Sequence, residues 1–132
     1  MLQRFDRTGR AHPLYAEAVR HGGTLYLSGI APLDEAGRVV GGPDARRQAD
    51  AVFRTMQTIL LAHGAGFADV VKLTVYLRDI ADRAGVAQSR ARWFAGARPA
   101  STLIAVSALG LPDMLLEVDA IAALPCEKEN LP

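Results

Sequence analysis

Cysteine is almost absent from this chain, because Cys126 is the only one in 132 residues. A single cysteine excludes an intramolecular disulfide, which suits a reducing compartment. The first residues lack the apolar segment of a signal peptide. No apolar run approaches the roughly 20 residues that a membrane-spanning helix needs. The sequence therefore predicts a cytoplasmic protein with no membrane partner.

An excess of charge of either sign is also missing. The formal net charge is +1, whereas nucleic-acid-binding domains usually carry a clear basic surplus. We therefore expect no nucleic-acid partner and no nuclease activity. His12, His21 and His63 do not have the spacing of metal ligands. There is no Gly-x-Ser-x-Gly elbow, phosphate loop or dinucleotide fingerprint. The sequence thus predicts no metal and no cofactor.

What the chain does contain is enough apolar sequence for one folded domain. Half of the residues are hydrophobic and 22% are charged, a balance typical of a globular protein. We expect a single domain over residues 1–123 and a C-terminal tail over 124–132. Apolar residues at helical spacing predict a helix from Asp44, its N-cap, to His63, which we interpret as structural. A second helix is predicted over Asp79–Ala95.

The remaining apolar segments have the alternation of strands. The predicted strands are Leu2–Phe5, Leu14–Arg20, Leu25–Gly29, Val70–Leu77, Ser101–Val106 and Met114–Ala122. A polar loop over Arg7–Pro13 and a turn over His21–Thr24 separate the first three.

Val70–Leu77 is the most apolar of these strands and is expected to be central, with Val71, Leu73, Val75 and Leu77 on one face. Two helices beside a mixed sheet make a two-layer α+β fold with both helices on one face. The second face of the sheet then needs cover, which indicates self-association.

The most unusual local feature is a pair of acids on an apolar strand. Side chains alternate across a strand, so Glu117 and Asp119 share one face. Arg98 precedes Pro99 at the start of the preceding strand, which could bring a cation near these acids. The pattern leaves two interpretations open: a polar site, or charges that simply face water, which is the common situation for these residue types.

Three stretches together resemble a known family. They are Leu25–Asp34, Gly64–Leu77 and Leu116–Ala122, and their order and spacing resemble those of the Rid (reactive intermediate deaminase, or YjgF) family. The resemblance covers roughly residues 12–123. It implies a fold like that of one class of chorismate mutase and a homotrimer with clefts between subunits. It also implies hydrolysis of small enamines and imines to keto acids and ammonia, without a cofactor.

The resemblance also implies site residues. Tyr15, Ser28, Gly29 and Glu117 fall at family positions. Glu117 would be the catalytic residue that assists the attacking water, and the others would bind the substrate. Asp119 falls where a second acid often lies.

The chain departs from the deaminating pattern at the residues that would hold the substrate. Ser101 stands after Pro99-Ala100, where the pattern has an arginine that binds the substrate carboxylate. Arg98 lies three positions before Ser101 and is expected, with Ser101, to hold a polar or anionic group. Ala87 stands where asparagine is frequent, and Ile30 where glutamine is common. Two functions follow: a hydrolytic enamine or imine deaminase, or a non-catalytic trimeric protein that binds a small ligand.

Overall fold

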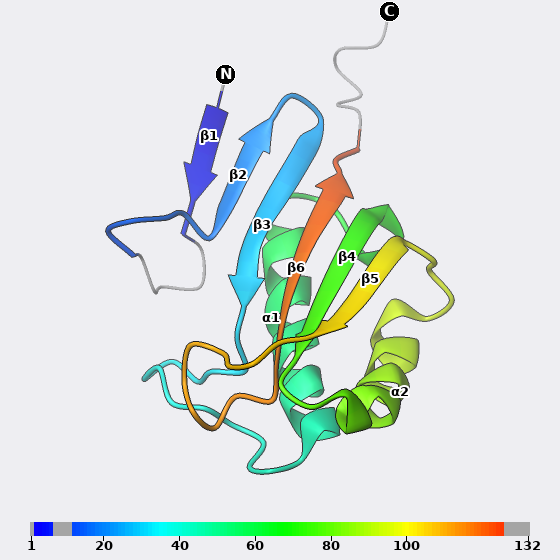
Figure 1. Cartoon of the computed structure of the whole chain (residues 1–132). Coiled ribbons are helices and arrows are strands. Elements are labelled where there is room, and N and C mark those ends of the chain that lie inside the picture. Colours follow the sequence, from blue (N-terminus) through cyan, green and yellow to red (C-terminus); the bar gives the residue numbers. More distant parts are fainter. Residues whose placement is uncertain (1, 7–11, 126–132) are drawn as a thin grey trace, which may run out of the picture.

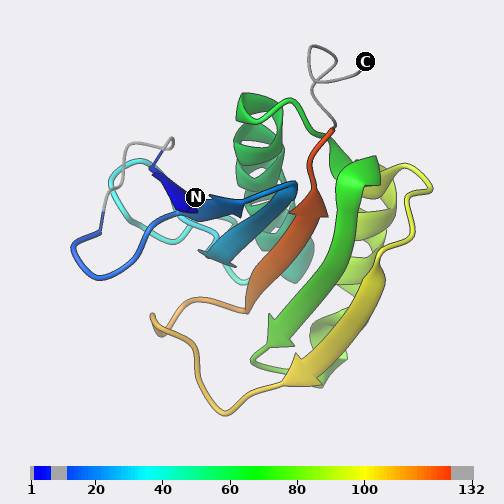
Figure 2. The same ribbon diagram turned by 90° about the horizontal axis from the view of Figure 1, so that it is seen from above.

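The computed structural model describes residues 2–6 and 12–125. Within them, six strands form one sheet in the order β1-β2-β3-β6-β4-β5. The strands are β1 (Leu2–Phe5), β2 (Ala18–His21), β3 (Thr24–Ile30), β4 (Val70–Leu77), β5 (Ala100–Ala105) and β6 (Leu116–Ala123). Two helices, α1 (Ala45–Ala62) and α2 (Arg83–Phe94), lie side by side on one face of the sheet (Figures 1 and 2).

The sheet is mixed because β4 and β5 pair in parallel, whereas the other neighbouring strands are antiparallel. The chain reverses direction between β2 and β3 at Gly22, which has a positive φ of 61° and makes the tight turn of the predicted hairpin. The predicted two-layer α+β architecture is confirmed. The predicted loop over Arg7–Pro13 and the tail over 124–132 lie largely outside the described residues.

The strand predicted over Leu14–Arg20 is wrong at its start, because β2 begins only at Ala18. The residues just before β2 are held by hydrogen bonds from Ser28 of β3. The Ser28 hydroxyl donates to the Ala16 carbonyl at 2.6 Å, and the Ser28 N–H donates to the Glu17 carbonyl at 2.9 Å. These two bonds hold the segment before β2 next to β3, although this segment does not pair with β3 as a strand.

Strand β4 is an interior strand of the sheet, as predicted, and its neighbours are β6 and β5. Its alternation is broken at one point. Val71 was expected on the buried face with Leu73, but 48% of it is exposed. The reason is an irregularity in the pairing with β6 between Val70 and Lys72, since a bulge moves the following side chain to the other face.

Helix α1 agrees with the sequence: the Asp44 side chain accepts hydrogen bonds from the N–H groups of Arg46 and Arg47 at 3.0 and 3.3 Å. The second predicted helix is interrupted. Asp79 caps the short 3₁₀ helix η2 (Ile80–Asp82) through the Ala81 N–H, and α2 follows from Arg83. A further 3₁₀ helix, η1 (Phe67–Asp69), precedes β4.

The hydrophobic core fills the space between the sheet and the two helices. Its largest fully buried side chains are Phe53, Leu25, Met56, Ile59, Leu60, Leu73, Leu77 and Leu116. Gln48 of α1 is also fully buried. Its amide donates to the carbonyls of Gly42 and Asp113 at 2.8 and 2.9 Å and accepts from the Leu115 N–H at 2.8 Å. Leu115 is therefore bonded to the helix layer and is not part of β6, which corrects the predicted start at Met114.

Candidate active site

The two acids of β6 lie on the face of the sheet that points away from the helices. Along β6, Leu116, Val118 and Ala120 are buried in the core, whereas Glu117 and Asp119 between them are partly exposed. The alternation predicted for this strand is therefore confirmed. The neighbouring strand β4 places Tyr76 opposite Glu117 and Thr74 opposite Asp119, so polar groups from two strands gather on this face.

Glu117 packs against Gly29 of β3. A Cβ atom at position 29 would clash with the Glu117 carboxylate, because it would lie within 2.9 Å of the carboxyl carbon and closer still to Oε1. Real Cβ atoms do not approach other atoms this closely. Glycine at position 29 therefore provides the space that the Glu117 side chain fills, and the pairing of β3 with β6 brings the two residues together.

The surroundings of Glu117 favour its neutral form. Burial raises the pKa of Glu117, and the negative charge of Asp119 raises it further. Asp119 in turn accepts a hydrogen bond from the Tyr76 hydroxyl at 2.8 Å, and that bond is the main reason why the pKa of Tyr76 is raised. The site thus holds a carboxyl group that can exchange a proton closer to neutrality than an ordinary glutamate.

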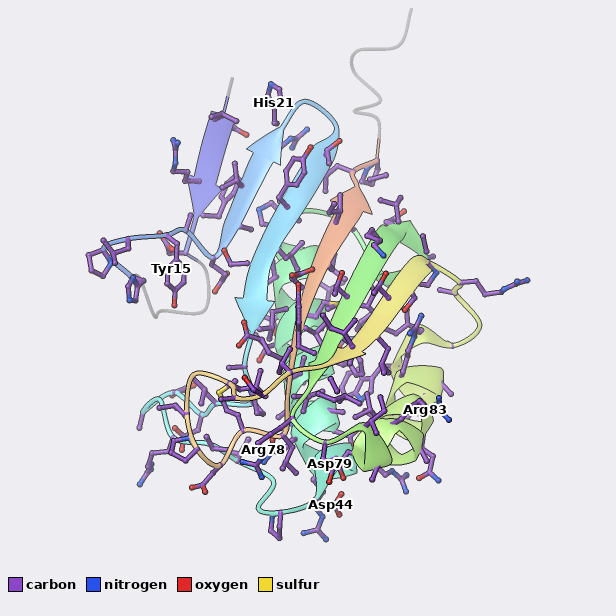
Figure 3. The ribbon with its side chains drawn as sticks, viewed as in Figure 1. Tyr15, His21, Asp44, Arg78, Asp79 and Arg83 are labelled. Atoms are coloured by element: carbon purple, nitrogen blue, oxygen red, sulfur yellow. The ribbon has the colours of Figure 1, made fainter. Side chains whose placement is uncertain are left out.

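A cavity of about 320 Å³ lies at the same end of β3, on its helix side. Ser28 and Gly29 line it together with Tyr15, His12 and residues of α1. Tyr15 is exposed and stacks on the His12 ring, with 4.2 Å between the ring centroids, and it extends from the segment that precedes β2 (Figure 3). Tyr15, Ser28 and Gly29 therefore line one cavity, and Glu117 packs against Gly29 from the open face of the sheet.

Arg98 and Ser101 lie elsewhere. They belong to the edge formed by β5, which β4 separates from β6 (Figure 1). Ala100 pairs with Lys72 of β4, whereas Glu117 pairs with Tyr76 of the same strand. Lys72 and Tyr76 are four residues apart, so the start of β5 lies roughly 13 Å from Glu117 along the strand direction. Arg98 is exposed and precedes this position. Within one chain, therefore, Arg98 does not lie near Glu117 and Asp119, although the sequence had suggested that it could.

Ser101 faces the helix layer, since it pairs with the buried Leu73 of β4. Its hydroxyl accepts a hydrogen bond from Nη1 of Arg90, on α2, at 2.8 Å. The sequence alone gave Arg90 no functional role. The signal that could have identified it is a charge among apolar residues at helical spacing. Tyr76 was likewise given no role beyond its place in the strand.

His63 agrees with the structural interpretation, since its Nδ1 lies 2.8 Å from the Ile59 carbonyl and its ring packs against Phe5. Among residues 2–6 and 12–125, no group of three histidines, cysteines, aspartates or glutamates is arranged to hold a metal ion. In the same part of the chain, no helix is both long and apolar enough to cross a membrane.

Comparison with known proteins identifies the fold. Residues 8–124 match the family model described as endoribonuclease L-PSP. A RutC family protein of Pyrococcus abyssi is 37% identical over 109 residues, which are 82% of this chain and 84% of that protein. The 3-aminoacrylate deaminase RutC of Acinetobacter baylyi is 37% identical over 108 residues, which are 82% of this chain and 85% of the relative.

The crystal structure of a protein of the Rid family from Yersinia pestis superposes with a TM-score of 0.87 at 27% identity, covering 94% of this chain and all of that one. The chain therefore belongs to the endoribonuclease L-PSP family, the family of the RutC, Rid and YjgF proteins.

Proposed function

We propose that this protein is a cytoplasmic hydrolase that converts small enamines or imines to carbonyl compounds and ammonia, in clefts between the subunits of a homotrimer. The observation that carries the proposal is the Glu117 carboxyl group, which lies half-buried against Gly29 with a raised pKa. Because its pKa is raised, this carboxyl group keeps its proton to a higher pH than an ordinary glutamate does, which suits proton transfer to and from water.

Imine hydrolysis needs few functional groups from the protein, because the carbon of an imine is already electrophilic. An enamine first takes a proton from water on its carbon and becomes the protonated imine. Ionised Glu117 then accepts a proton as water adds to the electrophilic carbon and forms a neutral carbinolamine. Protonated Glu117 passes that proton to the carbinolamine nitrogen. The carbon–nitrogen bond then breaks as the hydroxyl group gives its proton back to Glu117, and ammonia leaves together with the carbonyl product. The hydrogen bond from the Tyr76 hydroxyl holds the Asp119 carboxylate in place beside Glu117.

The proposed trimer is supported by what the open face of the sheet exposes. Tyr26 of β3 and Ile104 of β5 are 46% and 41% exposed, although large apolar side chains on a sheet usually become covered. The residues of the candidate site are divided between the β3–β6 region and the β5 edge. In the proposed trimer, a second subunit brings the two sets together.

The name of the Acinetobacter baylyi relative adds support for the substrate class. That protein is a 3-aminoacrylate deaminase, and 3-aminoacrylate is a small enamine with a carboxylate. By similarity, we propose a small carboxylated enamine or imine as the substrate of this chain.

The test is ammonia release from freshly generated 2-iminopropionate, measured against spontaneous hydrolysis. We expect acceleration by the protein and, in Glu117→Gln, a loss of about 100-fold or more, the usual size of a general acid–base contribution. Glu35→Gln is the matched control, because Glu35 is exposed in a loop. Size-exclusion chromatography with light scattering checks that the variant keeps the wild-type assembly. Equal turnover of Glu117→Gln and wild type would remove Glu117 from the mechanism.

One observation favours the second candidate, a trimer that binds a small ligand without chemical change. Ser101 offers a hydroxyl and no charge at a position where the family resemblance implies an arginine. Under this alternative, the protein does not accelerate imine hydrolysis, and a bound small molecule is recovered unchanged after long incubation.

A further inference from the structure

Arg90 is a charged residue on the packed side of α2. It lies one helical turn after the buried Val86 and one turn before the buried Phe94. Its guanidinium carbon lies 5.6 Å from the centroid of the Phe94 ring, and its Nη1 donates to Ser101 at 2.8 Å. The side chain is thus held in one place between the helix and β5.

The charge of Arg90 has no carboxylate partner in the described part of the chain. The arginines that form ion pairs there include Arg38, with Asp34, and Arg47, with Asp44. Burial lowers the pKa of Arg90, because the surroundings remove water from the cation without supplying an anion. A guanidinium has five N–H donors in a planar fork, and the neutral Ser101 hydroxyl takes one of them. An incoming anion would restore the lost stabilisation.

The position of Arg90 leaves room for such an anion. Ser101 lies on β5, the outermost strand of the sheet, whose second edge pairs with no strand among residues 2–6 and 12–125. Ser101 itself is exposed. Arg98, by contrast, is an exposed residue of the connection before β5, so water already solvates its charge and little is gained when it meets an anion.

We propose that Arg90, oriented by Ser101, binds the carboxylate of the substrate in a cleft to which a second subunit contributes Glu117 and Gly29. This inference rests on the proposed function, because an imine or enamine formed from an α-amino acid carries a carboxylate beside the reacting carbon. A guanidinium holds a carboxylate through two parallel N–H···O bonds, which fixes its direction as well as its place. Ser101 is then a positioning residue, and Arg90 supplies the charge.

The test is binding of pyruvate, a carboxylate that needs no turnover, with the neutral pyruvamide as the comparison ligand. We expect wild type to bind pyruvate in preference to pyruvamide. Arg90→Gln should weaken pyruvate binding by about 10- to 100-fold, the range for hydrogen bonds to a charged group, and should abolish the preference. Arg83→Gln is the matched control, because Arg83 is an exposed arginine of the same helix, and it should change the affinity less than about twofold.

A rescue experiment separates binding from a merely structural role. The double variant Arg90→Gln with Ser101→Arg returns a guanidinium to the same edge from β5 and should recover part of the pyruvate affinity. Arg90→Lys keeps the charge and the apolar stem but loses the fork, so it should bind about tenfold more weakly than wild type. Arg90→Lys is also the variant to use if Arg90→Gln does not fold.

The outcomes distinguish this proposal from the proposed function. Pyruvate binding that depends on Arg90 without ammonia release would overturn the deaminase function and keep the anion site. Ammonia release with an unchanged KM in Arg90→Gln, or in folded Arg90→Lys if needed, would overturn the role of Arg90 and keep the deaminase. Loss of pyruvate binding in Arg98→Gln alone would assign the charge to Arg98. Wild type that does not prefer pyruvate to pyruvamide would overturn the anion site.

Discussion

The carboxylate of Glu117 lies in the space above Gly29 that any other residue at position 29 would fill with its Cβ. The two residues are far apart in the sequence and meet because β3 and β6 are neighbours in the sheet. The position of the candidate catalytic acid therefore depends on a glycine that carries no chemistry of its own.

Gly29→Ala should displace the Glu117 carboxylate. The atoms in the way are at the flexible end of a side chain, so the carboxylate moves more easily than the backbone. We expect a loss of about 1 kcal/mol in the free energy of unfolding, the low end of the cost of overpacking. We also expect at least a tenfold loss of imine hydrolysis, because a misplaced group loses its contribution. Denaturant unfolding and ammonia release measure the two effects.

A double-mutant cycle provides the control for this prediction. In a Glu117→Ala background the obstructing carboxylate is gone, so Gly29→Ala should cost less stability than it does in wild type. Equal costs in both backgrounds would show that the methyl group meets something other than Glu117.

The raised pKa of Glu117 predicts how stability changes with pH. Burial and the charge of Asp119 raise the folded-state pKa above the ordinary value of 4.5, so the folded state binds this proton more tightly than the unfolded state. Stability therefore falls as the pH rises from 4.5 through the raised pKa, and the cost is complete above it. Glu117→Gln cannot ionise and should gain stability relative to wild type across that interval.

Chemical denaturation of both proteins at several pH values between about 4 and 8 measures this difference. Glu35→Gln, at an exposed loop position, is measured in parallel as the control for replacing a glutamate by glutamine. A difference between Glu117→Gln and wild type that is independent of pH would contradict the raised pKa.

Gln48 should be among the most sensitive polar positions for stability. Its amide joins the start of α1 to the Gly42 and Asp113 carbonyls and to the Leu115 N–H. Gln48→Ala leaves these groups without their bonds inside the protein, and unsatisfied buried groups cost roughly 1 to 3 kcal/mol each. We expect a loss of about 3 kcal/mol in the free energy of unfolding, measured by denaturant titration. Gln57→Ala, at an exposed position of the same helix, should change stability by less than about 0.5 kcal/mol.

The pattern of side chains along each segment was enough to predict most of the fold. The alternation around Glu117, the N-cap of α1 and the glycine turn between β2 and β3 depend on neighbouring residues, so they are visible in the sequence. The bulge at Val71 and the late start of β2 at Ala18 were missed, because contacts with distant residues override the local pattern there.

The sequence by itself determined the two-layer architecture, the shared face of Glu117 and Asp119, and the residues that resemble the family. Only the tertiary structure decided which of them meet. Strand order and register are set by pairing between remote segments, and they bring Gly29 to Glu117 while they keep Arg98 away from it. They also place Ser101 beside Arg90, a contact between helix and strand that local spacing cannot show.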